Sequence, residues 1–283
     1  MRFIFILLLV GFWWQLPAAA QAPAPPLAPE PAVLVGAYRL TYQPDSTDPA
    51  KRSDILYLLL GKTLSQFRSR GEQASDSLLA IFEKLPFNQE TATLLSTQIS
   101  ALPHSRSHYS IYKTTVPQRV YQYDRIGLQH YCYEEPPPLA WTIVPATATV
   151  AGYACQRATA TFGGRQWEAW FTRAVPVSDG PYKFYGLPGL IVKVGDTRQH
   201  YVFELAQLAK PTAERLLTLP KKTPTTTDRA AFRRARADYD ADPIGRLAPA
   251  ATGGAGVISQ DPDKDRQLAR ERLKKNNNPL ELK

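Results

Sequence analysis

The sequence predicts a mainly β protein, with a curved antiparallel meander sheet, one or two covering helices, and a charged C-terminal tail of low order. Three observations predict this class. Short segments with alternating apolar and polar residues recur through 33–210, and turns rich in Gly or Pro separate many of them. Only 75–85 in that region has a clear apolar stripe at helical spacing. After residue 210 the composition shifts to charged, Thr and small residues.

The first 22 residues are predicted to be a secretory signal peptide. Arg2 gives a positive start, an apolar run follows at 3–14, and small residues before Ala22 offer a cleavage site after that residue. The alternative is a membrane anchor, but the run is short for a bilayer and Pro17 follows it. We therefore expect a secreted or periplasmic protein with no transmembrane span in the mature chain. Residues 23–32 form a Pro/Ala-rich leader.

The first half of the predicted β domain, 33–210, contains strands and one helix. The helix at 75–85 can begin at Ser75, which has a capping side chain. Residues 90–102 fit either a second helix or a loop. The predicted strands are 33–42, 54–60, 63–68, 109–113, 118–123, 128–134 and 139–144.

The second half of the domain has the most regular strand pattern. Gly163-Gly164 forms a two-residue hairpin turn between strands at 153–162 and 166–172. Further strands are expected at 182–185, 190–194 and 201–208. Consecutive strands of this kind form an antiparallel sheet with at least one covered apolar face.

The segment 211–283 is predicted to be a basic tail, partly helical and partly disordered. It contains a basic helix at 228–239, a loose Gly-rich stretch at 248–259 and a charged helix at 263–275. The formal net charge of +9 suggests nucleic-acid binding, but an exported protein rarely meets nucleic acid and acidic residues are interspersed. We expect no nucleic-acid partner and a solvated charged surface.

The string from Gly186 to Ile191 is the most specific feature of the chain. Pro188 and Gly189 suit the second and third positions of a type II turn, and Leu187 and Leu190 can anchor that turn to the sheet. This predicts a structural turn formed by Gly186, Pro188 and Gly189.

This string closes a longer block that resembles the GLPGLI family of secreted Bacteroidetes proteins. The block comprises residues 150–159, 162–172, 175–177, 180–184 and 186–191. Weaker echoes are the residues Ser65 to Ser69 and the segment 276–282. The resemblance implies secretion, a β-rich fold and no assigned catalysis, and it transfers no catalytic residue.

Several Ser, Asp, His and Cys residues are of the types found in catalytic sites, but the sequence around them does not match a known catalytic motif. Ser178, Asp179 and His200 could form a triad, but the flanking residues favour turn chemistry. Cys155 could pair with His130 or His200. Cys155 could also form a disulfide with Cys132, or both could be buried thiols. The four His are scattered, so we predict no metal, no cofactor and no catalytic residue.

A cluster of aromatic and basic residues around two consecutive hairpins is the candidate ligand site. It comprises Arg165, Trp167, Trp170, Tyr182, Lys183 and Tyr185. One interpretation is ordinary sheet core. The other is a concave face for an apolar or peptide ligand, with helix 75–85 as its lid. The predicted function is a non-enzymatic binding or carrier module of the cell envelope. The alternatives are a secreted hydrolase and a structural protein that partners an outer-membrane receptor.

Overall fold

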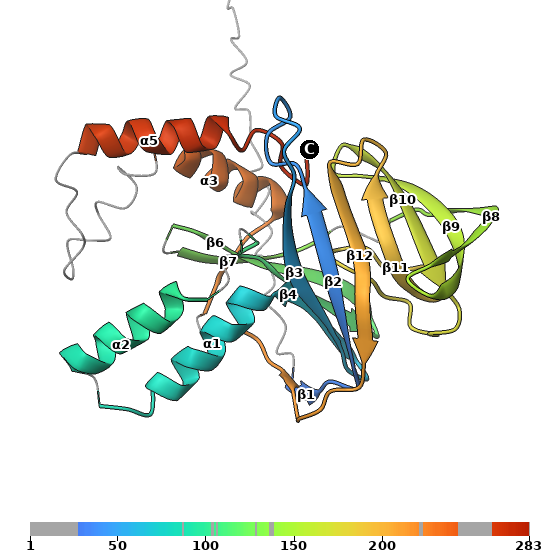
Figure 1. Ribbon diagram of the computed structural model, residues 1–283, viewed down its shortest axis with the longest axis horizontal. Coiled ribbons are helices and arrows are strands. Elements are labelled where there is room, and N and C mark those ends of the chain that lie inside the picture. Colours follow the sequence, from blue (N-terminus) through green and yellow to red (C-terminus); the bar gives the residue numbers. More distant parts are fainter. Residues whose placement is uncertain are drawn as a thin grey trace, which may run out of the picture.

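Two consecutive meanders, joined side by side, make one strongly curved sheet of twelve strands (Figure 1). The computed structural model describes residues 28–86, 88–102, 105, 107–127, 129–135, 139–220, 223–242 and 262–282. The strand order is β14-β7-β6-β5-β4-β3-β2-β12-β11-β10-β9-β8. The mainly β class is therefore confirmed, as is its antiparallel meander. The predicted signal peptide lies outside the described residues.

The first meander follows the chain from the centre of the sheet to one side. Its strands are β2 (Leu34–Tyr42), β3 (Arg52–Leu60), β4 (Leu64–Ser69), β5 (Ser110–Thr115), β6 (Gln118–Ile126) and β7 (Gln129–Glu134). Two residues of β14 (Thr225–Thr226) extend it in parallel to β7.

The second meander returns from the opposite edge to the centre. Its strands are β8 (Thr142–Val150), β9 (Tyr153–Phe162), β10 (Arg165–Thr172), β11 (Leu190–Asp196) and β12 (Tyr201–Ala209). β12 pairs with β2, with Tyr201 opposite Tyr42. A separate pair joins β1 (Glu30–Pro31) to β13 (Leu216–Leu217).

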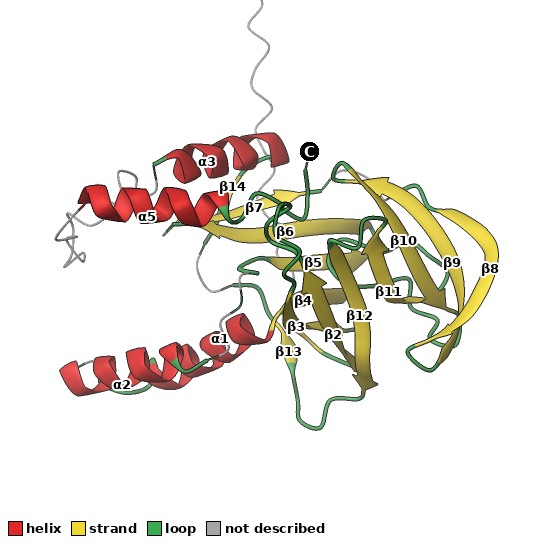
Figure 2. Cartoon of the chain, turned by 45° about the horizontal axis from the view of Figure 1, so that its top comes forward, coloured by secondary structure: helices red, strands yellow, loops and turns green. Residues whose placement is uncertain are grey.

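Helices α1 (Arg70–Phe82) and α2 (Gln89–Ser100) form a hairpin that projects from β4 (Figure 2). α1 begins earlier than predicted because Ser69, not Ser75, caps it by accepting a hydrogen bond from the Glu72 amide. α2 settles the ambiguity at 90–102 in favour of a helix, which starts at a capping box of Asn88 and Thr91. The hairpin lies away from β9–β11 in Figure 1, so the predicted helix is not a lid over the aromatic hairpins.

The interior of the curved sheet is filled by the chain itself. Residues 180–187, which we call the aromatic plug, connect β10 to β11 through the core rather than over the surface. Tyr182, Phe184 and Tyr185 are buried, and the ring centroids of Phe184 and Trp167 lie 4.6 Å apart. The expected strand at 182–185 is therefore wrong. Its apolar side chains are surrounded by core residues. The Phe184 amide donates to the Pro181 carbonyl within the same segment, whereas in a strand it would donate to a neighbouring strand.

The turn after the plug is tighter than a type II turn. The Gly189 amide donates to the Leu187 carbonyl at 2.8 Å, which encloses Pro188 alone. The Leu190 amide donates to Val175 rather than back across the turn. Gly189 has φ of 147°, and a Cβ there would lie 2.1 Å from the Thr172 carbonyl oxygen. The structural role predicted for Pro188 and Gly189 therefore rests on a different turn geometry.

Much of the expected tail returns to the sheet. Helix α3 (Arg229–Ala241) packs Phe232 against Tyr131 and Tyr133 of β7. Helix α5 (Pro262–Lys274) leads to residues 276–282, which we call the C-terminal strap. In the strap, Asn278 is buried and the Leu282 amide donates to the Gly163 carbonyl.

None of the helices in the described part of the chain has the length and apolar character that spanning a bilayer requires.

Candidate functional site

The six residues predicted to bind a ligand lie within or beside the core. Trp170 is partly exposed, and the other five, Arg165, Trp167, Tyr182, Lys183 and Tyr185, are each less than a tenth exposed. The rings of Trp167 and Tyr182 both pack against Phe184, and Tyr182 also stacks on Phe203. The cluster is therefore filled with its own side chains, and an apolar ligand has no room there without rearrangement of the plug.

The two basic members of that cluster bind parts of this chain. Lys183 Nζ contacts Glu135, lies 2.7 Å from Glu281 Oε1 and donates to the Tyr133 hydroxyl at 3.1 Å. Arg165 donates to Asp196 at 3.1 Å and to the Asn278 side chain at 2.6 Å. Both cations thus hold the C-terminal strap.

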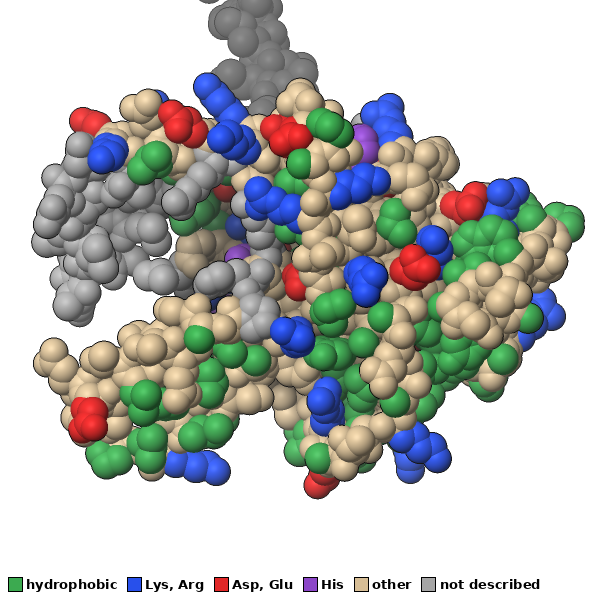
Figure 3. All heavy atoms as spheres, viewed as in Figure 1, with side chains coloured by type: hydrophobic (Ala, Val, Ile, Leu, Met, Phe, Trp, Pro, Cys, Tyr) green, Lys and Arg blue, Asp and Glu red, His purple; other side chains and the backbone are tan. Residues whose placement is uncertain are grey.

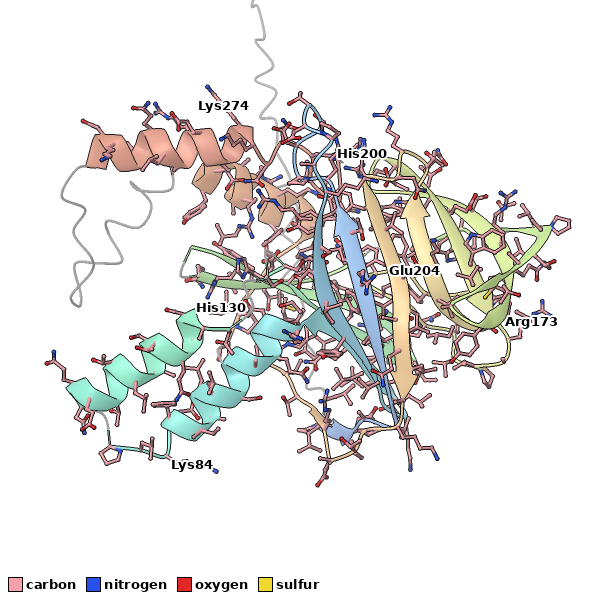
Figure 4. The ribbon with its side chains drawn as sticks, viewed as in Figure 1. Lys84, His130, Arg173, His200, Glu204 and Lys274 are labelled. Carbon is pink, nitrogen blue, oxygen red and sulfur yellow. The ribbon has the colours of Figure 1, made fainter. Side chains whose placement is uncertain are left out.

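The structure separates the groups proposed for nucleophilic chemistry. Asp179 contacts Lys113 Nζ and accepts from the Ser65 hydroxyl at 2.5 Å, which makes it an ion-pair partner in the core. Cys155 Sγ lies 3.3 Å from the Tyr153 carbonyl. His130 belongs to β7 and His200 directly precedes β12, and Figure 4 shows the two residues well apart in the fold. These positions leave the hydrolase hypothesis without an assembled site.

Of the two alternatives left open for Cys132 and Cys155, the structure has the buried thiols and not the disulfide. Cys132 and Cys155 are both free and buried, and they belong to different hydrophobic clusters. One lies on β7 and the other on β9, near opposite edges of the sheet. Burial raises the pKa of Cys132 to about 11 and also raises the pKa of Cys155.

A small polar pocket between α1 and the strands β4 to β7 is a candidate site. It has a volume of about 80 Å³. Its walls include the ends of β4–β7, the first turn of α1 and the segment near Pro220 and Pro224. We call it the polar pocket, and its chemically active lining is Arg68, Glu72, His108, Ser110, Tyr123, Asp124, Arg125 and His130.

Sheet register brings three hydrogen-bond donors of the pocket into one row. Arg68 of β4 lies opposite Ser110 of β5, and Ser110 lies opposite Tyr123 of β6. Residues directly opposed in an antiparallel sheet point to the same face. Arg68, Ser110 and Tyr123 are each less than a tenth exposed, so this row forms a wall of the pocket rather than open surface.

The Tyr123 hydroxyl is a buried donor in this row. It makes no hydrogen bond to nitrogen or oxygen in the described structure, and its polar neighbour is the Cys132 thiol, a weak partner. Burial raises the pKa of Tyr123, so the hydroxyl keeps its proton.

The two carboxylates of the pocket are already paired. Glu72 Oε1 lies 2.9 Å from His108 Nδ1. Burial alone would raise the pKa of Glu72, but this contact and nearby charges outweigh it and lower the pKa. Asp124 pairs with Arg236 at 3.3 Å and accepts from the Gln122 amide. Burial still raises the pKa of Asp124.

Sequence reasoning missed this pocket. Arg68 lies in the weak family echo Ser65 to Ser69, and His130 appeared only as a partner for Cys155. The row depends on the register of three strands, and the helical hairpin separates Arg68 from Ser110. No local spacing rule joins residues 68, 110 and 123.

The fold and pocket define a curved-sheet β protein with a filled interior. A family model described as a protein of unknown function (Porph_ging) matches residues 163–193, which include the plug and its turn. That short match does not extend to the rest of the chain, and it does not confirm the GLPGLI name. The comparison with curated proteins gave no match.

Among solved structures, the chain is similar to one described as "Structure of PNGF-II in C2 space group". The TM-score is 0.50 at 12% identity, over 73% of this chain and 33% of that chain. A P21 crystal form of PNGF-II gives a TM-score of 0.47 over the same shares. The likeness concerns the fold alone, and this chain spans about a third of the length of that protein.

Proposed function

We propose that this chain is an exported, non-enzymatic binding module of the cell envelope, and that its ligand occupies the polar pocket. The observation that carries the proposal is the donor row of Arg68, Ser110 and Tyr123, which lines the cavity, together with the buried Tyr123 hydroxyl that has no nitrogen or oxygen partner among the described residues. Buried polar groups are normally satisfied. A wall that contains a buried hydroxyl without a conventional partner therefore suits a polar ligand or ordered water.

Because the interior of the curved sheet is filled with side chains, we favour a binding site at the surface over the internal cavity that a carrier of apolar ligands would need. Carriers of apolar molecules need an internal cavity. Here Trp167, Phe184 and Phe203 occupy the space inside the curved sheet. The ligand is therefore polar and small, and it binds from the side on which α1 meets the sheet.

A ligand screen with the mature chain tests this function. A panel of small polar compounds is measured by native mass spectrometry, together with compounds that copurify with the exported protein. His130→Trp narrows the pocket, whereas Gln129→Trp on the same strand changes a residue outside the lining. We expect a bound compound that His130→Trp loses and Gln129→Trp keeps. Equal binding by both variants, or no bound compound, contradicts the proposal.

A second candidate function is docking of an envelope protein at β8. Among the described residues this strand ends the sheet and has β9 as its one neighbour, and it borders a depression of about 570 Å³. The unpaired edge can accept an added strand from a partner, although Pro145 and a register shift between Ile143 and Thr147 disturb half of it. Thr149→Lys should then abolish capture of an outer-membrane partner without affecting ligand binding in the pocket.

A further inference from the structure

We infer that the polar pocket recognises a small oxyanion, a carboxylate or phosphate group, carried at one end of its ligand. This inference rests on the proposed function and names the chemical class of the group that enters the pocket.

The balance of charge around the pocket favours an anion. Arg68 and Arg125 line the pocket together with Glu72 and Asp124, and Arg236, which lies beside it, pairs with Asp124. Because Glu72 is paired with His108 and Asp124 with Arg236, neither carboxylate is available to repel an entering anion at full strength.

The donor row has the geometry for one oxyanion. Adjacent strands lie about 4.8 Å apart, so Arg68 and Tyr123 stand on either side of Ser110 at roughly 10 Å across the sheet. The arginine side chain is long enough to reach back over Ser110. A guanidinium and two hydroxyls can then donate to the oxygens of a single carboxylate or phosphate.

The size of the pocket limits what enters. At about 30 Å³ for each water, a volume of about 80 Å³ holds two or three waters. That space suits the oxyanion itself but not a whole sugar or nucleoside. The remainder of the ligand lies outside the pocket, near Arg125, which is exposed.

The inference is tested by calorimetric titration of the full mature chain with sodium phosphate and sodium acetate. Chloride at equal ionic strength serves as the reference, and a neutral diol tests for uncharged ligands. Tyr123→Phe removes the buried hydroxyl of the pocket. Tyr109→Phe is the matched control, because its hydroxyl is also buried but does not line the pocket.

We expect saturable binding of one or both oxyanions, and the preferred one identifies the source as carboxylate or phosphate. Tyr123→Phe should weaken binding of the oxyanion about tenfold, as expected for loss of a hydrogen bond to a charged group. Tyr109→Phe should leave it unchanged, and Arg125→Gln should weaken it about threefold with a smaller dependence on salt.

Three results would overturn the inference. One is equal loss in the two tyrosine variants. A second is oxyanion binding that His130→Trp leaves intact, which places the anion elsewhere. A third is binding of the diol, or of a neutral compound from the screen, without oxyanion binding. That third outcome rejects the anion while the proposed function stands, whereas failure of the whole screen rejects both.

Discussion

Lys183 and Glu281, 98 positions apart in the chain, form a buried ion pair 2.7 Å long that ties the C-terminal strap to the aromatic plug. Glu281 also accepts from Arg229 at 2.5 Å and from Arg233 at 3.1 Å. The strap is thus held by α3 and by the plug together. This arrangement places the last residues of the chain among those on which the fold depends.

The charge on Glu281 should be a major source of acid sensitivity. Burial alone would raise its pKa, but Lys183 and Arg229 outweigh burial and hold it at about 2. The folded pKa therefore lies below the usual 4.5. The stabilisation is fully present above about pH 4.5 and is lost as pH falls towards 2, with a total on the order of 3 kcal/mol.

Urea denaturation at several pH values measures this effect. Glu281→Gln should lose roughly 3 kcal/mol at pH 7, because buried Lys183 and the neighbouring Arg229 must then share Glu135 as their carboxylate partner. It should also show a weaker decline of stability below pH 4.5 than the parent chain. Glu204→Gln is the control, since its pair with Lys193 is solvent-exposed and should contribute under about 1 kcal/mol. Equal losses in the two variants would refute the role given to Glu281.

The two neighbouring asparagines of the strap should differ in their contributions. Asn278 is buried, accepts from Arg165 and donates to the Gln43 carbonyl at 2.7 Å. Asn277 makes exposed hydrogen bonds to Ser46 and Asp45. Asn278→Ala should cost about 2 kcal/mol of unfolding free energy, because buried Arg165 and the partly buried Gln43 carbonyl each lose one hydrogen-bond partner. Asn277→Ala should cost less than about 1 kcal/mol, and the reverse order in thermal denaturation would contradict this account.

The surface of the helical hairpin should tolerate loss of apolar side chains. Ile81 is 58% exposed and Leu94 is 48% exposed, and Figure 3 shows apolar side chains on this hairpin. Ile81→Ser should therefore change the unfolding free energy by less than about 0.5 kcal/mol. Leu58→Ser, at a position with no exposure in β3, should prevent stable folding. A large loss for Ile81→Ser, measured by urea denaturation, would show that the hairpin packs on something in solution.

Local pattern predicted the strands well where each has one covered face. In β9 and β10 the alternation and the Gly163-Gly164 turn define both elements, and Arg165 pairs with Phe162 as a two-residue turn requires. The plug was mistaken for a strand because Tyr182, Phe184 and Tyr185 have strand-forming side chains. The local sequence does not show that this segment crosses the core without pairing with a neighbouring strand.

The interactions that attach the C-terminal strap to the sheet could not be predicted from the local sequence, for a different reason. Glu281 and Asn278 sit in a polar, charged sequence that suggests a solvated tail. Their burial depends on Arg165 and Lys183, which stand more than 90 positions earlier. A charged residue is buried only when its partner is present, and the sequence does not show which partners meet.

The thiols of Cys132 and Cys155 should be unreactive in the folded protein. Both are buried, and burial raises the pKa of Cys132 to about 11, so little reactive thiolate exists near neutral pH. A thiol assay with Ellman's reagent should detect almost none in buffer and both in guanidinium chloride. If denatured, unreduced protein shows no thiols, the cysteines are bridged and the separate positions on β7 and β9 are refuted.

Gly189 should be the least replaceable glycine of the turn after the plug. Alanine there meets two costs, because φ of 147° is unfavourable for any side chain and the new Cβ would lie 2.1 Å from the Thr172 carbonyl oxygen. We expect Gly189→Ala to lower the unfolding free energy by at least about 3 kcal/mol. Gly152→Ala separates the two costs, since Gly152 has φ of 81° but no atom within 4 Å of the added Cβ. It should lose about 1 kcal/mol from backbone strain alone. Urea denaturation followed by tryptophan fluorescence compares them, and a Gly189→Ala loss no larger than that of Gly152→Ala would show that β10 moves aside and that the contact with Thr172 does not fix the turn.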